Sequence, residues 1–257
     1  MKHVHGVLKT IASIQACMLL SAASCRAIAE ELVVSGAASL SNAFTEIGKR
    51  YEEDHPGSKV SFNFGASGAL LQQIATGATA DVLATADLET MDRAERENLL
   101  VTGTRRNFAR NRLVVVVPES SASSLSRLED LRGPGIARIG IGTPDSVPAG
   151  RYAKEALEAA GLWQTLVSKY IFGQNVRQVL DYVARGEVDA GFVYETDAEL
   201  FKGKVKVACE APVDEPVLYP IAIVQGTQRQ ALARDFLAYL TSESGLRILG
   251  KYGFSPP

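Results

Sequence analysis

Histidine and cysteine are scarce in this sequence of 257 residues, which contains three of each. Two of the histidines and two of the cysteines lie in the first 29 residues, so only His55 and Cys209 remain downstream. A single histidine disfavours both a Ser-His-Asp triad and a zinc site built from several histidines. A single cysteine cannot form an internal disulfide. We therefore interpret His55 as part of a solvated turn and Cys209 as a small buried residue that ends a strand.

Nucleotide-binding and hydrolase motifs are also absent. The sequence has no GxxxxGK[ST] phosphate loop, and Gly140-Ile141-Gly142 lacks the third glycine of a dinucleotide fingerprint. The run Gly65-Ala66-Ser67-Gly68-Ala69 misses the GxSxG nucleophile elbow, because alanine occupies the position of the second glycine. These absences count against nucleotide-dependent enzymes and serine hydrolases.

No block of basic residues is present. Three of the 27 Lys and Arg residues and none of the 29 Asp and Glu residues fall in the first 29 positions, so the rest of the chain has a formal charge of −5. Nucleic-acid binding depends on clustered Lys and Arg that neutralise phosphates. We therefore expect no nucleic-acid partner.

The N-terminus has the layout of a secretory signal. Lys2 and Lys9 precede an uncharged, largely apolar stretch over residues 10–24, which is followed by Ala27-Ile28-Ala29. A positive start, a short apolar middle and an A-x-A site predict a signal peptide over residues 1–29 and export to the periplasm. A retained membrane anchor is disfavoured, because the apolar stretch falls short of the roughly 20 residues that span a bilayer.

Lipid anchoring at Cys25 is a minor alternative. Ala22-Ala23-Ser24-Cys25 has the form of a lipoprotein cleavage box, although alanine stands three residues before the cysteine, where such boxes usually carry leucine. Acylation would leave the protein attached to the outer face of a membrane instead of free in the periplasm.

Downstream of residue 29, short β-rich runs alternate with helical patterns. Residues 32–34 read as a strand, residues 36–38 as a tight loop, and Ser39 as the N-cap of a helix. The plan repeats with a strand over residues 60–64, a glycine-rich loop and a helix that begins at Ser67. This rhythm predicts an α/β fold with largely parallel strands.

The same reading predicts further elements along the chain. Expected strands cover residues 81–84, 113–117, 138–141, 190–193, 205–209 and 221–224. Expected helices cover residues 148–160, 176–184 and 228–240. No repeat of fixed period is visible.

Four of the predicted helix starts suit an anion, because a helix N-terminus offers free backbone N–H groups and a partial positive charge. They are Ala38-Ser39, Ala66-Ser67, Val147-Pro148-Ala149-Gly150 and Asn175-Val176. Each start alone is weak evidence, because most such residues only cap their helices.

Taken together, these stretches resemble the periplasmic molybdate-binding proteins of bacterial ABC uptake systems. The matching runs, which span nearly the whole chain after residue 29, are Gly36-Ala37-Ala38-Ser39-Leu40-Ser41-Asn42-Ala43, Gly77-Ala78-Thr79-Ala80-Asp81-Val82-Leu83, Val147-Pro148-Ala149-Gly150-Arg151-Tyr152-Ala153-Lys154-Glu155-Ala156-Leu157, Asn175-Val176-Arg177, Val193-Tyr194, Tyr219-Pro220-Ile221-Ala222-Ile223-Val224 and Tyr252-Gly253-Phe254. The run that begins at Val147 is the most specific of them.

The resemblance implies a two-lobed type II periplasmic binding protein fold, with mixed sheets flanked by helices and a ligand cleft between the lobes. One lobe would comprise residues 30–112 and 219–257, and the other residues 113–218. The implied ligand is molybdate or tungstate, bound as an oxyanion without direct metal ligands and without a cofactor. The implied ligand-binding residues are Ser39, Ser67, Ala149, Val176 and Tyr194.

In this assignment both serines donate through hydroxyl and backbone N–H, Ala149 and Val176 through backbone N–H, and Tyr194 through its phenol. The Ser67 loop departs from the family's pattern, because Gly65 and Gly68 stand where the family often carries serine.

The resemblance also implies a monomer that delivers its ligand to an inner-membrane ABC permease and catalyses no reaction. Binding of another oxyanion, such as sulfate or phosphate, is the main alternative. A regulator's sensing domain would need a DNA-binding segment, and an enzyme would need an acid or base in the cleft. Asp145, Glu195 and Asp197 lie near the implied ligands in sequence, and we expect them to cap turns or face solvent.

Overall fold

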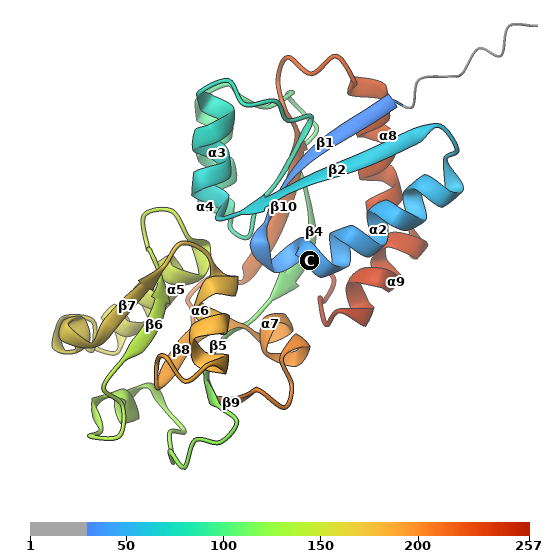
Figure 1. Cartoon of the computed structure of the whole chain (residues 1–257). Coiled ribbons are helices and arrows are strands. Elements are labelled where there is room, and N and C mark those ends of the chain that lie inside the picture. The colour runs from blue at the N-terminus through green and yellow to red at the C-terminus, as the bar shows by residue number, and fades with distance from the viewer. Residues whose placement is uncertain (1–29) are drawn as a thin grey trace, which may run out of the picture.

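The computed structural model describes residues 30–257, so the predicted signal peptide and Cys25 lie outside the described residues. Two lobes, each built on a five-stranded sheet with helices packed against it, make up this part of the chain (Figure 1). The strands are β1 (Glu30–Ala37), β2 (Ser58–Gly65), β3 (Val82–Ala84), β4 (Arg106–Asn111), β5 (Leu113–Pro118), β6 (Ile139–Gly142), β7 (Tyr170–Gly173), β8 (Ala190–Tyr194), β9 (Val205–Glu210) and β10 (Val217–Ile223).

The α-helices are α2 (Ser41–Asp54), α3 (Ser67–Ala75), α4 (Leu88–Arg96), α5 (Pro148–Ala159), α6 (Val176–Ala184), α7 (Glu195–Leu200), α8 (Gln230–Leu240) and α9 (Glu243–Lys251). Three 3₁₀ helices complete the set: η1 (Ala38–Leu40), η2 (Leu128–Arg132) and η3 (Gln164–Lys169). None of the helices within residues 30–257 combines the length and the apolar character that a membrane crossing requires.

The two sheets share one topology. The first has the order β2-β1-β3-β10-β4 and the second the order β7-β6-β8-β5-β9. In each sheet the first three strands are parallel, and the remaining two pairings are antiparallel. The prediction of largely parallel strands was therefore wrong for half of the pairings, because β5 and β10 enter their sheets against the direction of the parallel strands.

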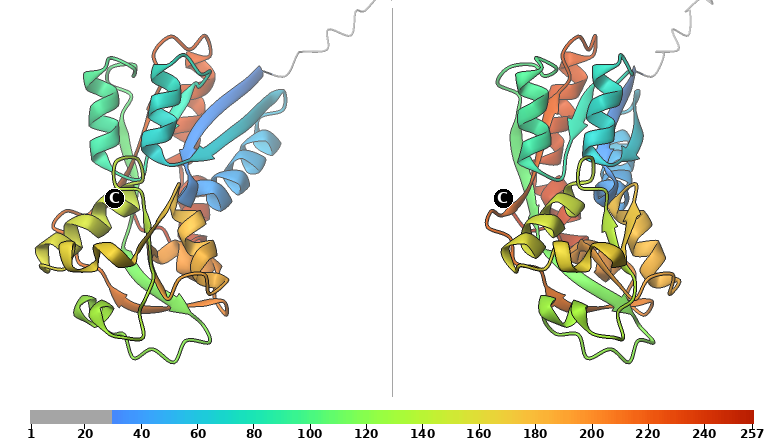
Figure 2. Two further views of the ribbon diagram at one scale, coloured as in Figure 1. Left: turned by 60° about the vertical axis from the view of Figure 1, so that its left-hand side comes forward. Right: turned by 90° about the vertical axis from the view of Figure 1, so that its left-hand side faces the viewer.

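Connection geometry explains where the helices lie. The chain leaves β1 for the edge strand β2 and then returns past β1 to β3, so the two crossovers run in opposite directions. Since such crossovers are right-handed, α2 and α3 cover opposite faces of the sheet. The second sheet repeats this arrangement with β6, α5, β7, α6 and β8, and Figure 2 shows its helices around the strands. Ligands of such sheets bind beyond the carboxyl ends of the parallel strands, where the crossovers diverge.

Buried apolar runs account for the central elements. Leu113, Val114, Val115, Val116 and Val117 of β5 are each no more than 3% exposed, as expected for a strand covered on both faces. Helix α2 buries the spaced residues Ala43, Phe44, Ile47, Gly48 and Tyr51. These residues belong to a core that extends through both lobes.

The chain passes between the lobes twice. The first sheet takes its strands from residues 30–111 and 217–223, and the second from residues 113–210. The first passage falls at Arg112, between β4 and β5, and the second falls between β9 and β10. The lobe boundaries given above stay a prediction, and β10 begins at Val217, two residues before the predicted boundary.

All the predicted strands and helices are present, with shifted ends. Strands β4 and β7 and helices α4, α7 and α9 were missed. The residue after α2, His55, lies in a turn as expected but is half-buried, with its ring stacked on Tyr51 at a centroid distance of 4.2 Å. Cys209 lies in β9 and is partly buried, and this burial raises the pKa of its thiol to about 11.

Candidate functional site

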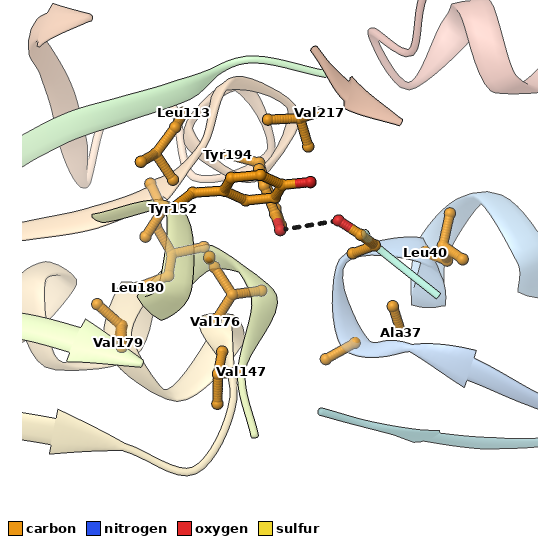
Figure 3. Packing of buried hydrophobic residues seen from close by; sticks show 14 of the residues in the cluster. Ala37, Leu40, Leu113, Val147, Tyr152, Val176, Val179, Leu180, Tyr194 and Val217 are labelled. Carbon is orange, nitrogen blue, oxygen red and sulfur yellow. Dashed lines mark hydrogen bonds between the residues drawn. The ribbon is translucent and has the colours of Figure 1, made fainter. Parts of the chain in front are cut away.

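All five predicted ligand residues line one small pocket between the lobes. Figure 3 shows residues from both sides of this pocket, with Ala37 on one side and Val147, Val176 and Tyr194 on the other. The lining residues are Ala37, Ala38, Ser39, Gly65, Ala66, Ser67, Ala86, Val147, Pro148, Ala149, Asn175, Val176 and Tyr194. Larger hollows lie elsewhere on the described residues, but charged side chains line them.

The pocket lies where strand ends and helix starts converge. Ser39 and Ser67 follow β1 and β2, whereas Ala149, Val176 and Tyr194 follow or end β6, β7 and β8. Helices α3, α5 and α6 therefore begin at the pocket, and their first N–H groups have no partner within the helix. These helix starts favour negative charge in the pocket.

Ser39 is fixed by a buried tyrosine. The Ser39 Oγ lies 3.0 Å from the Tyr219 hydroxyl, which accepts a hydrogen bond from Asn111 Nδ2 at 3.3 Å. When Asn111 donates to Tyr219 and Tyr219 donates to Ser39, the serine keeps its own proton for a group in the pocket. The expected N-cap role was wrong: Ser39 lies inside η1, and its side chain makes no cap bond to that helix or to α2.

Ser67 is oriented in the same way. Its Oγ accepts the backbone N–H of Ala86 at 3.1 Å and is fully buried. Since a hydroxyl has one proton, which is not used in this bond, Ser67 can donate it into the pocket. Ser67 is the first residue of α3, so its backbone N–H is one of the free donors at that helix start.

Backbone N–H groups come from the second lobe. Pro148 begins α5, which places Ala149 in the first helical turn. Gly150 lets this turn approach the end of β6, because a Cβ there would overlap the carbonyl oxygen of Gly142. At α6 the Asn175 side chain accepts the N–H of Gln178 at 3.0 Å, which caps the helix and leaves the N–H of Val176 free.

Tyr194 closes the pocket at the end of β8. Its side chain is 1% exposed, and its hydroxyl donates to the carbonyl of Ala86 in the other lobe over a long 3.4 Å. Burial raises the pKa of Tyr194 well above its ordinary value. The phenol therefore stays protonated at neutral pH and can act only as a donor to an anion.

The acids near the site behave differently from one another. Asp145 is exposed and Glu195 pairs with Arg112 at 2.5 Å on the surface, as expected of solvated groups. Asp197 does not face solvent: it is fully buried, with Oδ1 2.7 Å from Arg177 Nε. It has the other expected role, that of a cap, because its Oδ2 accepts the backbone N–H of Tyr194 at the start of α7 at 3.4 Å. None of the three lines the pocket, whose side chains carry no formal charge.

Several residues that act at this site were not predicted to do so. Tyr219 and Arg177 lie in runs that matched the family but carried no assigned role, and Ala86 lies in no such run. An ion pair links the lobes beside the pocket, from Arg151 of the second lobe to Asp87 and, at 2.8 Å, to Glu89 of the first. The backbone N–H of Gly68 donates to the carbonyl of Ser146 at 3.0 Å, so the lobes are in direct contact.

A metal ion has no ready site in residues 30–257, where no group of three or more His, Cys, Asp or Glu side chains is placed to hold one. What the pocket offers is a set of inward hydroxyl and N–H donors on an uncharged lining. Such a set suits a small anion that accepts hydrogen bonds on all sides.

Comparison with known proteins agrees with this geometry. Residues 32–255 match the family described as bacterial extracellular solute-binding proteins. The chain is 39% identical over 226 residues to the Bacillus subtilis protein YvgL, whose name describes an ABC transporter substrate-binding lipoprotein, covering 87% of this chain and 86% of that one. It is 38% identical over 239 residues to the molybdate-binding protein ModA of Escherichia coli, covering 89% and 91%.

The solved periplasmic molybdate-binding protein of Azotobacter vinelandii has the same fold. It superposes with a TM-score of 0.77 at 23% identity and covers 88% of this chain and 99% of its own. The predicted two-lobed type II periplasmic binding protein fold is thus confirmed. The chain belongs to the family of bacterial extracellular solute-binding proteins.

Proposed function

We propose that this protein captures molybdate or tungstate in the pocket between its lobes and delivers the anion to an ABC permease in the membrane. The observation that carries the proposal is the convergence of Ser39, Ser67, Ala149, Val176 and Tyr194 on one pocket with an uncharged lining. The names of the Escherichia coli and Azotobacter vinelandii relatives support the choice of ligand.

The energetics of this donor set are of the right order. Removing a dianion from water costs several kcal/mol or more. The two hydroxyls with their backbone N–H groups, the phenol and the two further N–H groups supply about seven hydrogen bonds, at about 1.5–3 kcal/mol each when the acceptor is charged. No lysine or arginine has to touch the ligand.

The donor set also favours fully deprotonated anions. Monohydrogen phosphate carries a proton that needs an acceptor, and no carboxylate lines the pocket to accept it. Molybdate and tungstate differ from sulfate mainly in the length of the bond from central atom to oxygen. Because helix starts hold the donors in fixed positions, the pocket can discriminate between these anions by that bond length.

The family supports a wider role, which we include in the proposal. The protein acts after export, as a monomer without a cofactor, and does not catalyse a reaction. An open form binds the anion, and closure about the passages near Leu113 and Tyr219 completes the contacts to both lobes. The described structure, with its lobes in contact, corresponds to the closed form.

Crystals grown with molybdate test the ligand and its site together. X-ray data collected near the molybdenum edge should show one strong anomalous peak in the pocket, with oxygen atoms within hydrogen-bond distance of Ser39, Ser67 and Tyr194. A peak elsewhere, or none in crystals that diffract well, would contradict the assignment.

A further inference from the structure

Arg177 reaches from the second lobe to the first at the edge of the pocket. It follows Val176 in α6, and its side chain is 20% exposed. Nη1 donates to Asn42 Oδ1 at 2.9 Å and Nη2 donates to the carbonyl of Ser39 at 3.2 Å. One guanidinium therefore joins the helix start of one lobe to the loop that carries Ser39 in the other.

The third nitrogen of this guanidinium faces a buried carboxylate. Arg177 Nε lies 2.7 Å from Asp197 Oδ1, but the N–H does not point along the line between the two atoms as a hydrogen bond requires. The Asp197 side chain is 0% exposed, and its Oδ2 accepts the backbone N–H of Tyr194 at 3.4 Å. The contact between the two side chains is thus mainly one of charge.

We propose that Arg177 is a positioning residue that couples anion capture to closure of the lobes, by cancelling the charge of Asp197 next to Tyr194 and by holding the Ser39 loop. The proposal rests on the anion-binding function proposed above. Arg177 does not line the pocket, so it acts on the anion through Ser39, Val176 and Tyr194 and not by contact.

The charges of Asp197 and Arg177 act on a bound anion in opposite directions. A carboxylate removed from water and left without a cation would repel a dianion bound at Tyr194, and this repulsion is weakly screened inside the protein. Burial raises the pKa of Asp197 above its ordinary value, and the nearby Arg177 charge works against this rise, so the arginine favours the ionised, paired form. The pair as a whole adds no net charge to the site.

The Arg177 guanidinium makes one contact within its own lobe and two contacts that cross between the lobes. Arg177 and Asp197 both belong to the second lobe, so their pair persists when the lobes separate. The bonds to Asn42 and to the Ser39 carbonyl exist only when the lobes are together. Asp197 therefore keeps the Arg177 guanidinium in position before the lobes close. On closure, Asn42 Oδ1 and the Ser39 carbonyl come within its reach, which favours the closed state once the anion is bound.

The test compares Arg177→Gln, Asp197→Asn and the double variant, with Arg185→Gln as the control. Arg185 is an exposed arginine at the end of the same helix. Molybdate affinity is measured by calorimetry, closure by the change in radius of gyration in small-angle scattering, and folding by the melting temperature without ligand. The wild type must first bind molybdate; if it does not, the proposed function fails, independently of Arg177.

We expect Arg177→Gln to weaken molybdate binding by about thirtyfold or more and to reduce the compaction that the anion causes. Asp197→Asn should lose much less affinity, because it leaves a positive charge near the anion. The double variant, Arg177→Gln with Asp197→Asn, should regain part of the molybdate affinity that Arg177→Gln loses. Arg185→Gln should bind molybdate as the wild type does.

Equal losses from the two single variants, or no recovery in the double variant, would overturn the charge role. Wild-type affinity in Arg177→Gln would overturn the whole inference. If Arg177→Gln does not fold, Arg177→Lys and the double variant carry the test, because neither leaves an unpaired buried carboxylate. Arg177→Lys should then bind more weakly than the wild type, because one ammonium cannot reach both acceptors in the first lobe.

Discussion

Each hydroxyl around the pocket has a protein partner that determines where its proton points. Ser67 accepts from Ala86, and Ser39 lies against Tyr219, which accepts from Asn111. These partners come from β4, β10 and the segment after β3. The geometry of the proposed anion site therefore depends on residues that do not themselves line the pocket, such as Tyr219.

Replacing Tyr194 by phenylalanine removes one donor and keeps the ring that packs at 5.8 Å from Tyr219. We expect molybdate affinity to fall about tenfold or more, as for the loss of a hydrogen bond to a charged group, and the melting temperature without ligand to stay close to that of the wild type. Calorimetry and thermal unfolding measure the two quantities, with Tyr182→Phe on α6 as the control. A loss of stability without a loss of affinity would count against Tyr194 as a ligand.

Gly68 tests how tightly the lobes must close. A Cβ at this position would lie 2.9 Å from the Cα and the carbonyl oxygen of Ser146 in the other lobe. Gly68→Ala should therefore hinder closure and weaken molybdate binding about tenfold, while the melting temperature without ligand stays near that of the wild type. Gly135→Ala is the matched control, because a Cβ there meets nothing within 4 Å. Equal affinities in the two variants would contradict this account of closure.

At the scale of elements, the sequence predicted most strands and helices, and the misses have a physical reason. Strand β4 has the sequence RNFARN, in which only Phe108 and Ala109 are buried, and β7 has four residues of which two are exposed. Both are edge strands. An edge strand buries fewer side chains, so its apolar pattern is weak.

The alternation of strand-like and helical segments along the sequence does not show which strands an antiparallel strand pairs with. Strand β10 follows all the strands of the second sheet in the sequence, yet it pairs with β3 and β4 of the first lobe. Local pattern shows that such a segment is a strand, but not which sheet accepts it. Four of the five candidate ligand residues lie at helix starts that suit an anion, but only the resemblance to the family joined them with Tyr194 in one site. A serine at a helix start is common and carries little information by itself.

The link between α2 and α9 gives a pH prediction. Hydrogen bonds from Lys251 and then Tyr252 to Glu46 lower the pKa of this carboxyl from its model-compound value of 4.5. A lowered pKa in the folded state stabilises the protein above pH 4.5, and this contribution is lost as the pH falls through the folded-state value.

Glu46→Gln should therefore lower the free energy of unfolding at pH 7 by about 1 kcal/mol or less, because the pair is partly exposed. The difference from the wild type should shrink as the pH falls below 4.5. Urea unfolding at several pH values measures it, with Glu243→Gln, whose partner Arg247 is exposed, as the control. A difference that grows on acidification would refute the assigned role of Glu46.

At the scale of the whole molecule, the proposed function makes binding and closure one event. Contacts from both lobes surround the pocket, and two arginines, Arg151 and Arg177, cross between the lobes beside it. Under this proposal the anion stabilises the closed form, because only that form brings all the donors within reach. The family resemblance predicted the two lobes and the cleft, but the arginine bridges became visible only once the lobes were seen in contact.

Calorimetric titration of the exported form with molybdate, tungstate, sulfate and phosphate at neutral pH tests the central claim most directly. The account predicts tight binding of molybdate and tungstate, with little or no heat from sulfate and phosphate. Tight binding of sulfate or phosphate, or no binding of any of the four anions, would contradict it.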